Sequence, residues 1–246
     1  MPTEIIAHRG ASREAPENTL ASIHLGWEQG ADAVEIDVHQ SRDGHMMVIH
    51  DSTTRKTARL NRRVGIQTLA ELKALDAGRW KNRRWSGEQI PTLAEAFATV
   101  PAGKRMFVEI KCSVDCLPQF VSTVRDSLLR PEQVVPIGFH LTTMRLIKWA
   151  LPKCEVCWVV AFRRSLRGWN PRVESIIAKA KEAGLDGIDV GARGPVNDAF
   201  TRKVHEAGLK LYIWTVDSPA KARRLIAAGV DGITTNRPGW LRGQLW

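Results

Sequence analysis

Short runs of β-branched and aromatic residues alternate with helical stretches from one end of this chain to the other. Such alternation is typical of parallel strands joined by crossover helices. Eight strands are predicted, at residues 4–8, 33–38, 105–110, 133–139, 155–160, 187–190, 210–215 and 231–235. Helices are predicted at residues 18–30, 92–99, 115–129, 142–150, 171–183, 197–207 and 218–228. This α/β pattern closes most simply into a (β/α)8 barrel, a TIM barrel, forming one domain over residues 1–246.

A ninth strand-like run, residues 46–50, interrupts the alternation. It follows the second strand too closely for a helical crossover, so only an antiparallel return fits. The Asp-Gly pair at residues 43–44 favours a two-residue hairpin turn, which would set Asp37 opposite His50. Residues 51–90 are then an insertion after a β-hairpin at the end of strand two, and we expect this insertion to cap the barrel mouth.

The insertion is strongly basic. Residues 51–90 hold ten Lys or Arg against four Asp or Glu, which accounts for most of the net charge of +10. A patch of this kind can attract phosphate-bearing ligands through its long-range field. The plainer interpretation is a solvated surface with no specific partner, and the composition alone does not decide between the two.

Composition indicates a soluble, folded protein. The chain is 43% hydrophobic and 25% charged, close to globular averages, and no apolar stretch approaches the roughly 20 residues that cross a bilayer. The first apolar run, residues 5–7, is broken at once by His8 and Arg9 and follows no basic segment, so we expect no secretory signal and a cytoplasmic location. We accordingly expect the four cysteines to be free thiols, and we regard a four-thiolate zinc site as a poor alternative.

Polar residues stand where the predicted strands end. These positions meet the substrate in a TIM barrel. The ends of the first two strands and of the third carry the residues His8, Arg9, Glu35, Asp37, Glu109 and Lys111, the return strand ends at His50, and the seventh strand ends near Trp214. Each also has a plainer interpretation, since a strand-end histidine is often structural and an alternating Glu-Ile-Asp can face solvent. Their joint placement favours one site.

The carboxylates in this group call for a cation. Side chains alternate along a strand, so Glu35 and Asp37 share one face, and Glu109 would converge on them from the next strand. Three carboxylates in a barrel repel one another unless they are neutralised, and oxygen ligands favour one hard divalent cation such as Mg²⁺, Ca²⁺ or Mn²⁺. With Arg9 and Lys111 beside it, such a cation suits the charge of a phosphate ester.

The motifs in their order resemble the glycerophosphodiester phosphodiesterase family. The resemblance spans nearly the whole chain and rests on the segments His8-Arg9-Gly10, Pro16-Glu17-Asn18-Thr19, Glu35-Ile36-Asp37-Val38, Asp43-Gly44, His50-Asp51, Ile90-Pro91-Thr92-Leu93, Glu109-Ile110-Lys111, Trp214-Thr215-Val216 and residues 229–233. It implies a barrel with an insertion after the His-Asp motif. It also implies that a small glycerophosphodiester is hydrolysed to glycerol 3-phosphate and an alcohol.

The resemblance also implies roles for individual residues. Metal ligands would be Glu35, Asp37 and Glu109, the acid and base pair would be His8 and His50, and substrate or phosphate contacts would come from Arg9, Lys111 and Trp214. Asn236 and Gly138 stand where family members often carry Asp and Ser, and we expect both to lie away from the catalytic set. We expect Asn18 to act as the N-cap of the first helix.

Two alternatives remain open at this stage. A lysophospholipase D would keep the chemistry and act on lysolipid diesters, with Trp80 and Trp85 of the basic insertion near a membrane surface. A catalytically silent phosphate-binding or nucleic-acid-binding barrel would use only the positive charge. We expect a small-molecule substrate, no nucleic-acid partner and no stable membrane insertion, because binding alone needs no acid and base pair.

Overall fold

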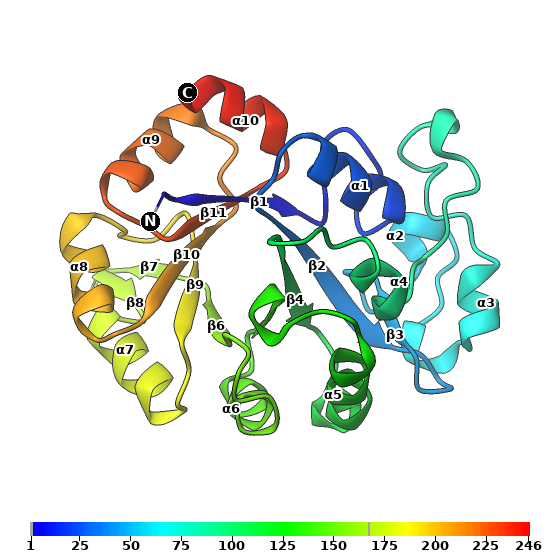
Figure 1. The fold of residues 1–246 in the computed structure, drawn as a ribbon, viewed down its shortest axis with the longest axis horizontal. Coiled ribbons are helices and arrows are strands. Elements are labelled where there is room, and N and C mark those ends of the chain that lie inside the picture. The colour runs from blue at the N-terminus through cyan, green and yellow to red at the C-terminus, as the bar shows by residue number, and fades with distance from the viewer. Residues whose placement is uncertain (1, 167) are drawn as a thin grey trace.

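The computed structural model describes residues 2–166 and 168–246, and within them eight parallel strands close a barrel (Figure 1). These strands are β1 (Glu4–His8), β2 (Ala33–Gln40), β4 (Arg105–Ile110), β5 (Val134–Gly138), β6 (Cys157–Val160), β9 (Gly187–Gly191), β10 (Lys210–Trp214) and β11 (Gly232–Thr235). Closure is complete because β1 pairs in parallel with both β2 and β11. The predicted TIM barrel is confirmed.

Helices surround the strands, as Figure 1 shows. The predicted ones are α1 (Leu20–Glu28), α4 (Leu93–Phe97), α5 (Leu117–Asp126), α6 (Leu141–Ala150), α7 (Val173–Glu182), α8 (Asp198–Glu206) and α9 (Pro219–Ala227). A helix that we did not predict, α10 (Pro238–Leu245), follows β11 and packs against α9 and β1. Proline at its first position suits a helix start, since that residue needs no intrahelical N–H bond. Among the described residues, no helix combines the length and apolarity needed to cross a membrane.

The core has two layers, because strands of a parallel barrel are buried on both faces. Aliphatic side chains such as Ile36, Val108 and Ile188 fill the space between strands and helices. The barrel interior is filled by a separate set that includes Ile6, Ala33, Phe107, Val135, Ile137 and Tyr212.

The antiparallel return is confirmed, but its predicted register is wrong by one residue. Strand β3 (Met46–Val48) pairs with β2 so that Val38 faces Val48. The residue opposite Asp37 is therefore Ile49, and not His50 as predicted. The reason is a three-residue loop in place of a two-residue turn. Gly44 adopts φ +90° and its N–H donates to the carbonyl of Ser41, as in a type I turn followed by a left-handed glycine.

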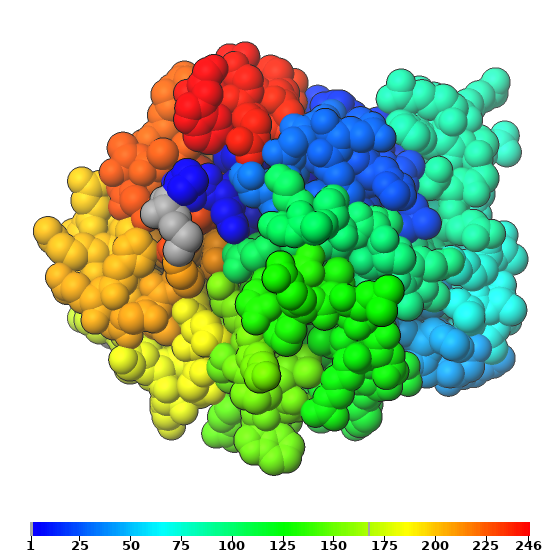
Figure 2. All heavy atoms as spheres, in the orientation of Figure 1, coloured from blue at the N-terminus to red at the C-terminus, as the bar shows by residue number. Residues whose placement is uncertain are grey.

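The basic segment, residues 51–90, folds into short helices: α2 (Arg55–Ala58), η1 (Val64–Ile66), α3 (Leu69–Lys73) and η2 (Arg83–Trp85). A small apolar cluster that includes Val64, Leu72 and Ile90 anchors it to the hairpin. In the space-filling view it forms the cyan to turquoise projection at one side of the molecule (Figure 2). A second hairpin, β7 (Arg163–Ser165) with β8 (Gly168–Asn170), follows β6 and was not predicted.

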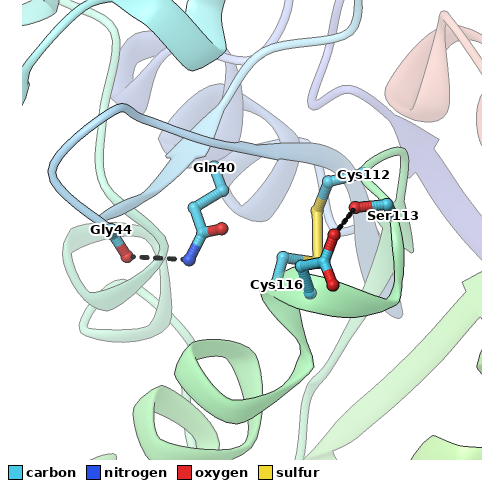
Figure 3. The surroundings of a disulfide bond; sticks show 6 residues. Gln40, Gly44, Cys112, Ser113 and Cys116 are labelled. Carbon is cyan, nitrogen blue, oxygen red and sulfur yellow. Dashed lines mark hydrogen bonds between the residues drawn. A yellow bond between two sulfur atoms is a disulfide. The ribbon is translucent and has the colours of Figure 1, made fainter.

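The expectation of four free thiols is wrong for two of them. Cys112 and Cys116 form a disulfide in the loop after β4, where one turn of 3₁₀ helix, η3 (Val114–Cys116), brings the two Cα atoms to 6.3 Å (Figure 3). Cys112 precedes this turn and Cys116 ends it, and their separation lies within the range of Cα distances that a disulfide spans. Cys154 and Cys157 are free, as predicted, and both are buried.

Candidate active site

The C-terminal ends of the barrel strands surround a cavity of about 230 Å³. Seven of the eight residues predicted for the site line it, namely His8, Arg9, Glu35, His50, Glu109, Lys111 and Trp214. Phe139, Asp189, two aliphatic residues and two threonines complete the lining. The eighth, Asp37, lies fully buried beside them. Among the described residues, none from 52–90 lines the cavity, but Lys56 and Lys81 of this segment bind Glu17 and the Ser12 carbonyl in the loop after β1.

Strand register explains how the three carboxylates converge. Asp37 on β2 lies directly beside Glu109 on β4, and Glu35 lies beside His8 on β1. Ligand atoms of Glu35, Asp37 and Glu109 all fall within 4.8 Å of one another, and no other such group of acidic, His or Cys residues occurs among the described residues. Burial and repulsion from Asp37 raise the pKa of Glu35 well above its usual value and that of Glu109 to about 7.

Two cations partly neutralise this acidic group. Arg9 Nε lies 3.2 Å from Asp37 Oδ2, and Lys111 Nζ lies 3.2 Å from Asp37 Oδ1 and 2.7 Å from Glu109 Oε1. Burial would raise the pKa of Asp37, but the charges of Arg9 and Lys111 lower it to about 2. Since three carboxylates face two cations, one negative charge remains uncompensated when all are ionised.

A divalent cation fits this donor set. All its donors are carboxylate oxygens on rigid strands, which is the ligation that Mg²⁺, Ca²⁺ and Mn²⁺ prefer. Asp37 Oδ1 is buried and lacks a hydrogen bond of good geometry, even though Lys111 lies near it. An oxygen left in this state in a negatively charged group is a suitable ligand for a cation.

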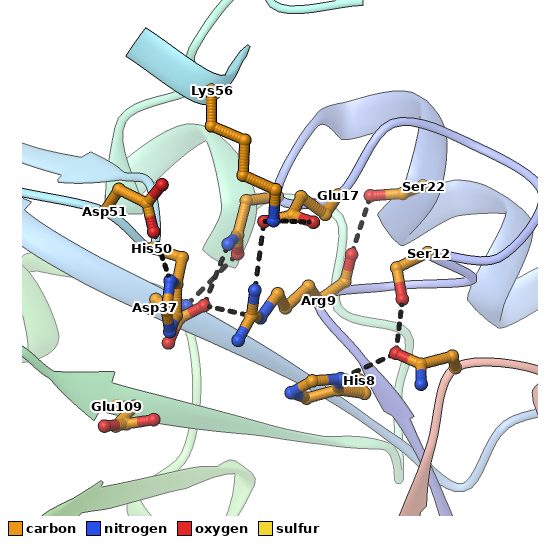
Figure 4. A network of polar contacts seen from close by, with 12 residues as sticks. His8, Arg9, Ser12, Glu17, Ser22, Asp37, His50, Asp51, Lys56 and Glu109 are labelled. Carbon is orange, nitrogen blue, oxygen red and sulfur yellow. Dashed lines mark hydrogen bonds and ion pairs between the residues drawn. The ribbon is translucent and has the colours of Figure 1, made fainter. Parts of the chain in front are cut away.

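The two histidines reach the cavity from different elements. His8, at the end of β1, donates from Nδ1 to Asn236 Oδ1 at 2.7 Å, while its Nε2 lies 4.0 Å from Glu35 Oε2. Burial and the nearby Arg9 lower the pKa of His8 to about 4. His50 follows β3, and its Nδ1 lies 2.7 Å from the Asp51 carboxylate (Figure 4).

The loop after β1 supplies residues whose importance the sequence alone did not reveal. Asn18 is not the N-cap of α1; that position belongs to Thr19, whose side chain accepts from the N–H of Ser22. The Asn18 side chain instead donates to Asp37 Oδ2 at 2.9 Å and accepts from the Asp37 N–H at 3.1 Å. Its φ of +59° turns it into the barrel, and periodicity does not report such a backbone reversal.

Glu17 in the same loop links the site to the basic segment. Its carboxylate binds Arg9 Nη1 at 3.0 Å and Lys56 Nζ at 2.7 Å (Figure 4). The turn that allows this begins at Gly10, with φ +77°, where a Cβ atom would lie 2.4 Å from the backbone of Ser22. The glycine is therefore required for the chain to pass so close to α1.

The expectation that Asn236 lies away from the catalytic set is wrong. Asn236 follows β11, and its amide oxygen contacts both His8 Nδ1 and Ser12 Oγ. The sequence did not predict this contact because the loop path after a strand does not follow from the strand's own pattern. Trp214 lies at the end of β10, the strand next to β11, and packs edge-on against Phe139 after β5, with ring centroids 5.8 Å apart.

A closed parallel barrel with acidic, basic and imidazole groups gathered at the C-terminal ends of its strands has the architecture of a TIM-barrel enzyme. The sequence pattern of the Glycerophosphoryl diester phosphodiesterase family matches residues 8–240. The chain belongs to this family, and it is a phosphoric diester hydrolase. The resemblance drawn from the motifs is thus confirmed, and the alternative of a catalytically silent binding barrel is wrong.

Individual relatives agree over nearly the full length. The chain is 32% identical over 255 residues to a glycerophosphodiester phosphodiesterase of Caldanaerobacter subterraneus subsp. tengcongensis, with 97% of this chain and 96% of the relative covered. It is 45% identical over 268 residues to the probable glycerophosphodiester phosphodiesterase 1 of Mycobacterium tuberculosis, with 98% and 91% covered. A solved structure of an Oleispira antarctica phosphodiesterase in complex with the product sn-glycerol-3-phosphate is similar at a TM-score of 0.89 and 26% identity, with 99% and 97% covered.

Proposed function

We propose that the enzyme hydrolyses glycerophosphodiesters to glycerol 3-phosphate and an alcohol, using a divalent cation held by Glu35, Asp37 and Glu109. The observation that carries this proposal is the convergence of these three buried carboxylates within 4.8 Å. Two histidines and two cations border the same small cavity. A cation site beside an acid and base pair is the equipment that phosphodiester hydrolysis needs.

The charges of the site match those of the substrate. When bound, the divalent cation would supply Lewis-acid stabilisation of the phosphate oxygens. Arg9 and Lys111 line the cavity and would hold the remaining phosphate charge. The three carboxylates and the two basic side chains together carry one negative charge, and the divalent cation would change this sum to one positive charge. A phosphodiester carries a single negative charge and would then neutralise the site.

The histidines would transfer protons during the reaction. His8 is neutral near pH 7 because burial and Arg9 lower its pKa to about 4, so we assign it as the base that removes a proton from the attacking glycerol hydroxyl. That oxygen forms a bond to phosphorus while the bond to the alcohol breaks. His50 would protonate the departing alcohol, and water would then open the cyclic phosphate with the two histidines exchanging roles.

The cavity limits what the site can enclose. About 230 Å³ is below the usual range for drug-sized ligands and suits a glycerol phosphate group, so the alcohol part would project outward. A lysolipid diester remains the second candidate substrate, because two exposed apolar side chains could contact its acyl chain. Phe139 lines the cavity and is 42% exposed, and Leu166 is fully exposed on the hairpin after β6.

The direct test measures glycerol 3-phosphate released from diesters with different alcohols, with and without a chelator. We expect chelation to abolish turnover, and His8→Ala to lower kcat by at least about 100-fold, the low end of an acid or base contribution. His24→Ala is the matched control, because this histidine is exposed on α1. Comparing water-soluble with lysolipid diesters separates the two candidate substrate classes.

Chelator-insensitive turnover would contradict the metal assignment. A fall in kcat that is the same for His8→Ala and His24→Ala would contradict the role given to His8. No release of glycerol 3-phosphate from any diester would remove the proposed reaction itself.

A further inference from the structure

A chain of hydrogen bonds runs from His8 away from the cavity to the loops after β10 and β11. His8 Nδ1 and Ser12 Oγ both lie within hydrogen-bond distance of Asn236 Oδ1, at 2.7 and 2.9 Å (Figure 4). The Asn236 side-chain nitrogen donates to Asp217 Oδ2 at 2.7 Å. These contacts join β1 to two loops more than 200 residues away in the sequence.

Asp217 fixes which way the Asn236 amide faces. Its Oδ1 accepts from Thr235 Oγ1 and from the Asn236 backbone N–H, both at 2.9 Å, so the carboxylate is held firmly. Burial would raise the pKa of Asp217, but the hydrogen bonds from Asn236 and Thr235 lower it. An ionised carboxylate only accepts, so the amide must turn its NH₂ group toward Asp217 and its oxygen toward His8.

The amide orientation in turn decides where the His8 proton lies. An amide oxygen can only accept, so Nδ1 must carry the hydrogen. Nε2 then presents a lone pair on the side that faces the cavity. Its distance of 4.0 Å from Glu35 Oε2 is too long for a hydrogen bond, and that oxygen accepts from the Arg9 N–H at 2.9 Å.

We propose that Asn236, held by Asp217, is a positioning residue that keeps His8 in the Nδ1-protonated tautomer, with Nε2 free to accept a proton in the cavity. The inference rests on the proposed function for the use that His8 makes of that nitrogen. A neutral amide suits this task, because it orients the ring and cannot itself take the proton. The alternative is that Asn236 only ties the last loop to β1.

The tautomer can be read without any activity measurement. In protein with ¹⁵N-labelled histidine, the two ring nitrogens of His8 differ in shift according to which one is protonated. The signals of His8 are identified among those of the seven histidines because they are missing from the spectrum of His8→Ala. We expect a protonated Nδ1 and an unprotonated Nε2 in the wild type. Finding the opposite tautomer in the wild type would overturn the proposal, whatever the variants do.

Three variants separate positioning from structural support. Asn236→Ala should release the tautomer and lower kcat by at least about 10-fold, with KM within about 2-fold of wild type. Asn236→Asp keeps an acceptor oxygen for His8 Nδ1 but places a second carboxylate where the Asn236 NH₂ group lies 2.7 Å from Asp217 Oδ2, so it should retain the wild-type tautomer and recover only part of kcat. Asn197→Ala is the matched control: it removes the N-cap of α8 and should destabilise the fold without altering His8.

An unchanged His8 tautomer in folded Asn236→Ala would overturn the proposal. So would a variant whose entire loss lies in KM or in the folded fraction. If His8→Ala proves fully active, the base role proposed for His8 fails, and the ¹⁵N spectra still decide whether Asn236 sets the tautomer.

Discussion

The carboxylates of the site depend on polar partners that come from loops. Asp37 is fully buried, and its side chain and backbone N–H are both bound by Asn18. Hydrogen bonds of this kind orient a metal ligand and restrict its motion, and losing them typically lowers metal affinity by about 10 to 100-fold. Asn18 therefore contributes to the site without lying among its proposed ligands.

Replacing Asn18 with glycine isolates this contribution. Glycine tolerates the φ of +59° that Asn18 adopts, so the variant removes the side-chain hydrogen bonds and leaves the backbone path unstrained. We expect Asn18→Gly to weaken divalent cation binding by about 10-fold or more, as measured by calorimetric titration. Arg59→Gly is the control, because Arg59 has φ +58° and lies exposed in the basic segment. Equal affinities for the two variants would contradict this account.

At the scale of elements, the β2–β3 hairpin shows how a single glycine determines the conformation of a loop. Gly44 adopts φ +90°, and a Cβ atom there would meet no neighbour within 4 Å, so substitution strains only the backbone. Gly44→Ala should lower the free energy of unfolding by about 1 kcal/mol, measured by urea denaturation. Gly65→Ala, where the nearest atom is an ordinary 3.7 Å away, should change it by less than about 0.5 kcal/mol. Indistinguishable losses would show that the loop conformation is not what Gly44 contributes.

The same hairpin shows which features of the fold could be predicted from the sequence and which could not. Strands were predictable because buried parallel strands are continuous apolar runs, and parallel strands all end at one mouth, so Glu35 and Glu109 could be placed together. The register between β2 and β3 was not predictable. The change from a two-residue to a three-residue loop depends on backbone angles that the residue types permit but do not impose. Contacts of Asn18 and Asn236 were missed for a related reason, because both lie in loops with no periodicity.

At the scale of the whole molecule, the two ends of the barrel have different roles. At the N-terminal end, the guanidinium of Arg105 binds Glu155 at 2.9 Å and Glu4 and the Tyr212 hydroxyl at 2.8 Å. These partners come from β1, β10 and the segment before β6, so a single side chain ties together strands across the barrel. In TIM barrels this end serves stability and the other end serves catalysis.

Arg105→Met should therefore separate stability from activity. We expect the free energy of unfolding to fall by about 2 kcal/mol or more, between the values typical of exposed and of buried ion pairs. The folded enzyme should keep its kcat and KM, because the substitution lies at the end opposite the cavity. Urea denaturation and steady-state kinetics check both statements, with Arg145→Met, exposed on α6, as the control. A lowered kcat in fully folded Arg105→Met would show that the two ends are coupled.

The acidic site should also make the stability of the whole barrel depend on pH and metal together. Because burial and Asp37 raise the pKa of Glu109 to about 7, the metal-free folded state keeps a proton that the unfolded chain releases near its ordinary value of 4.5. Folding then becomes less favourable as pH rises through this interval, since the folded state binds more protons than the unfolded one. The proposed divalent cation would need the charged carboxylates and would bind only where the fold brings them together, so it should offset this loss.

Thermal unfolding with a chelator or with excess Mg²⁺, Ca²⁺ or Mn²⁺ tests this coupling. In chelator, Tm should fall between about pH 5 and about pH 7, and the gain in Tm on adding the cation should grow over the same interval. Glu109→Gln replaces one titrating group with a neutral one of similar shape, so it should make the fall of Tm with pH in chelator less steep and weaken the metal response, while Glu35, whose pKa is also raised, still contributes. If Glu109 were already ionised in the metal-free barrel, the gain in Tm would not grow between about pH 5 and about pH 7, and that result would contradict the raised pKa of Glu109 on which this coupling depends.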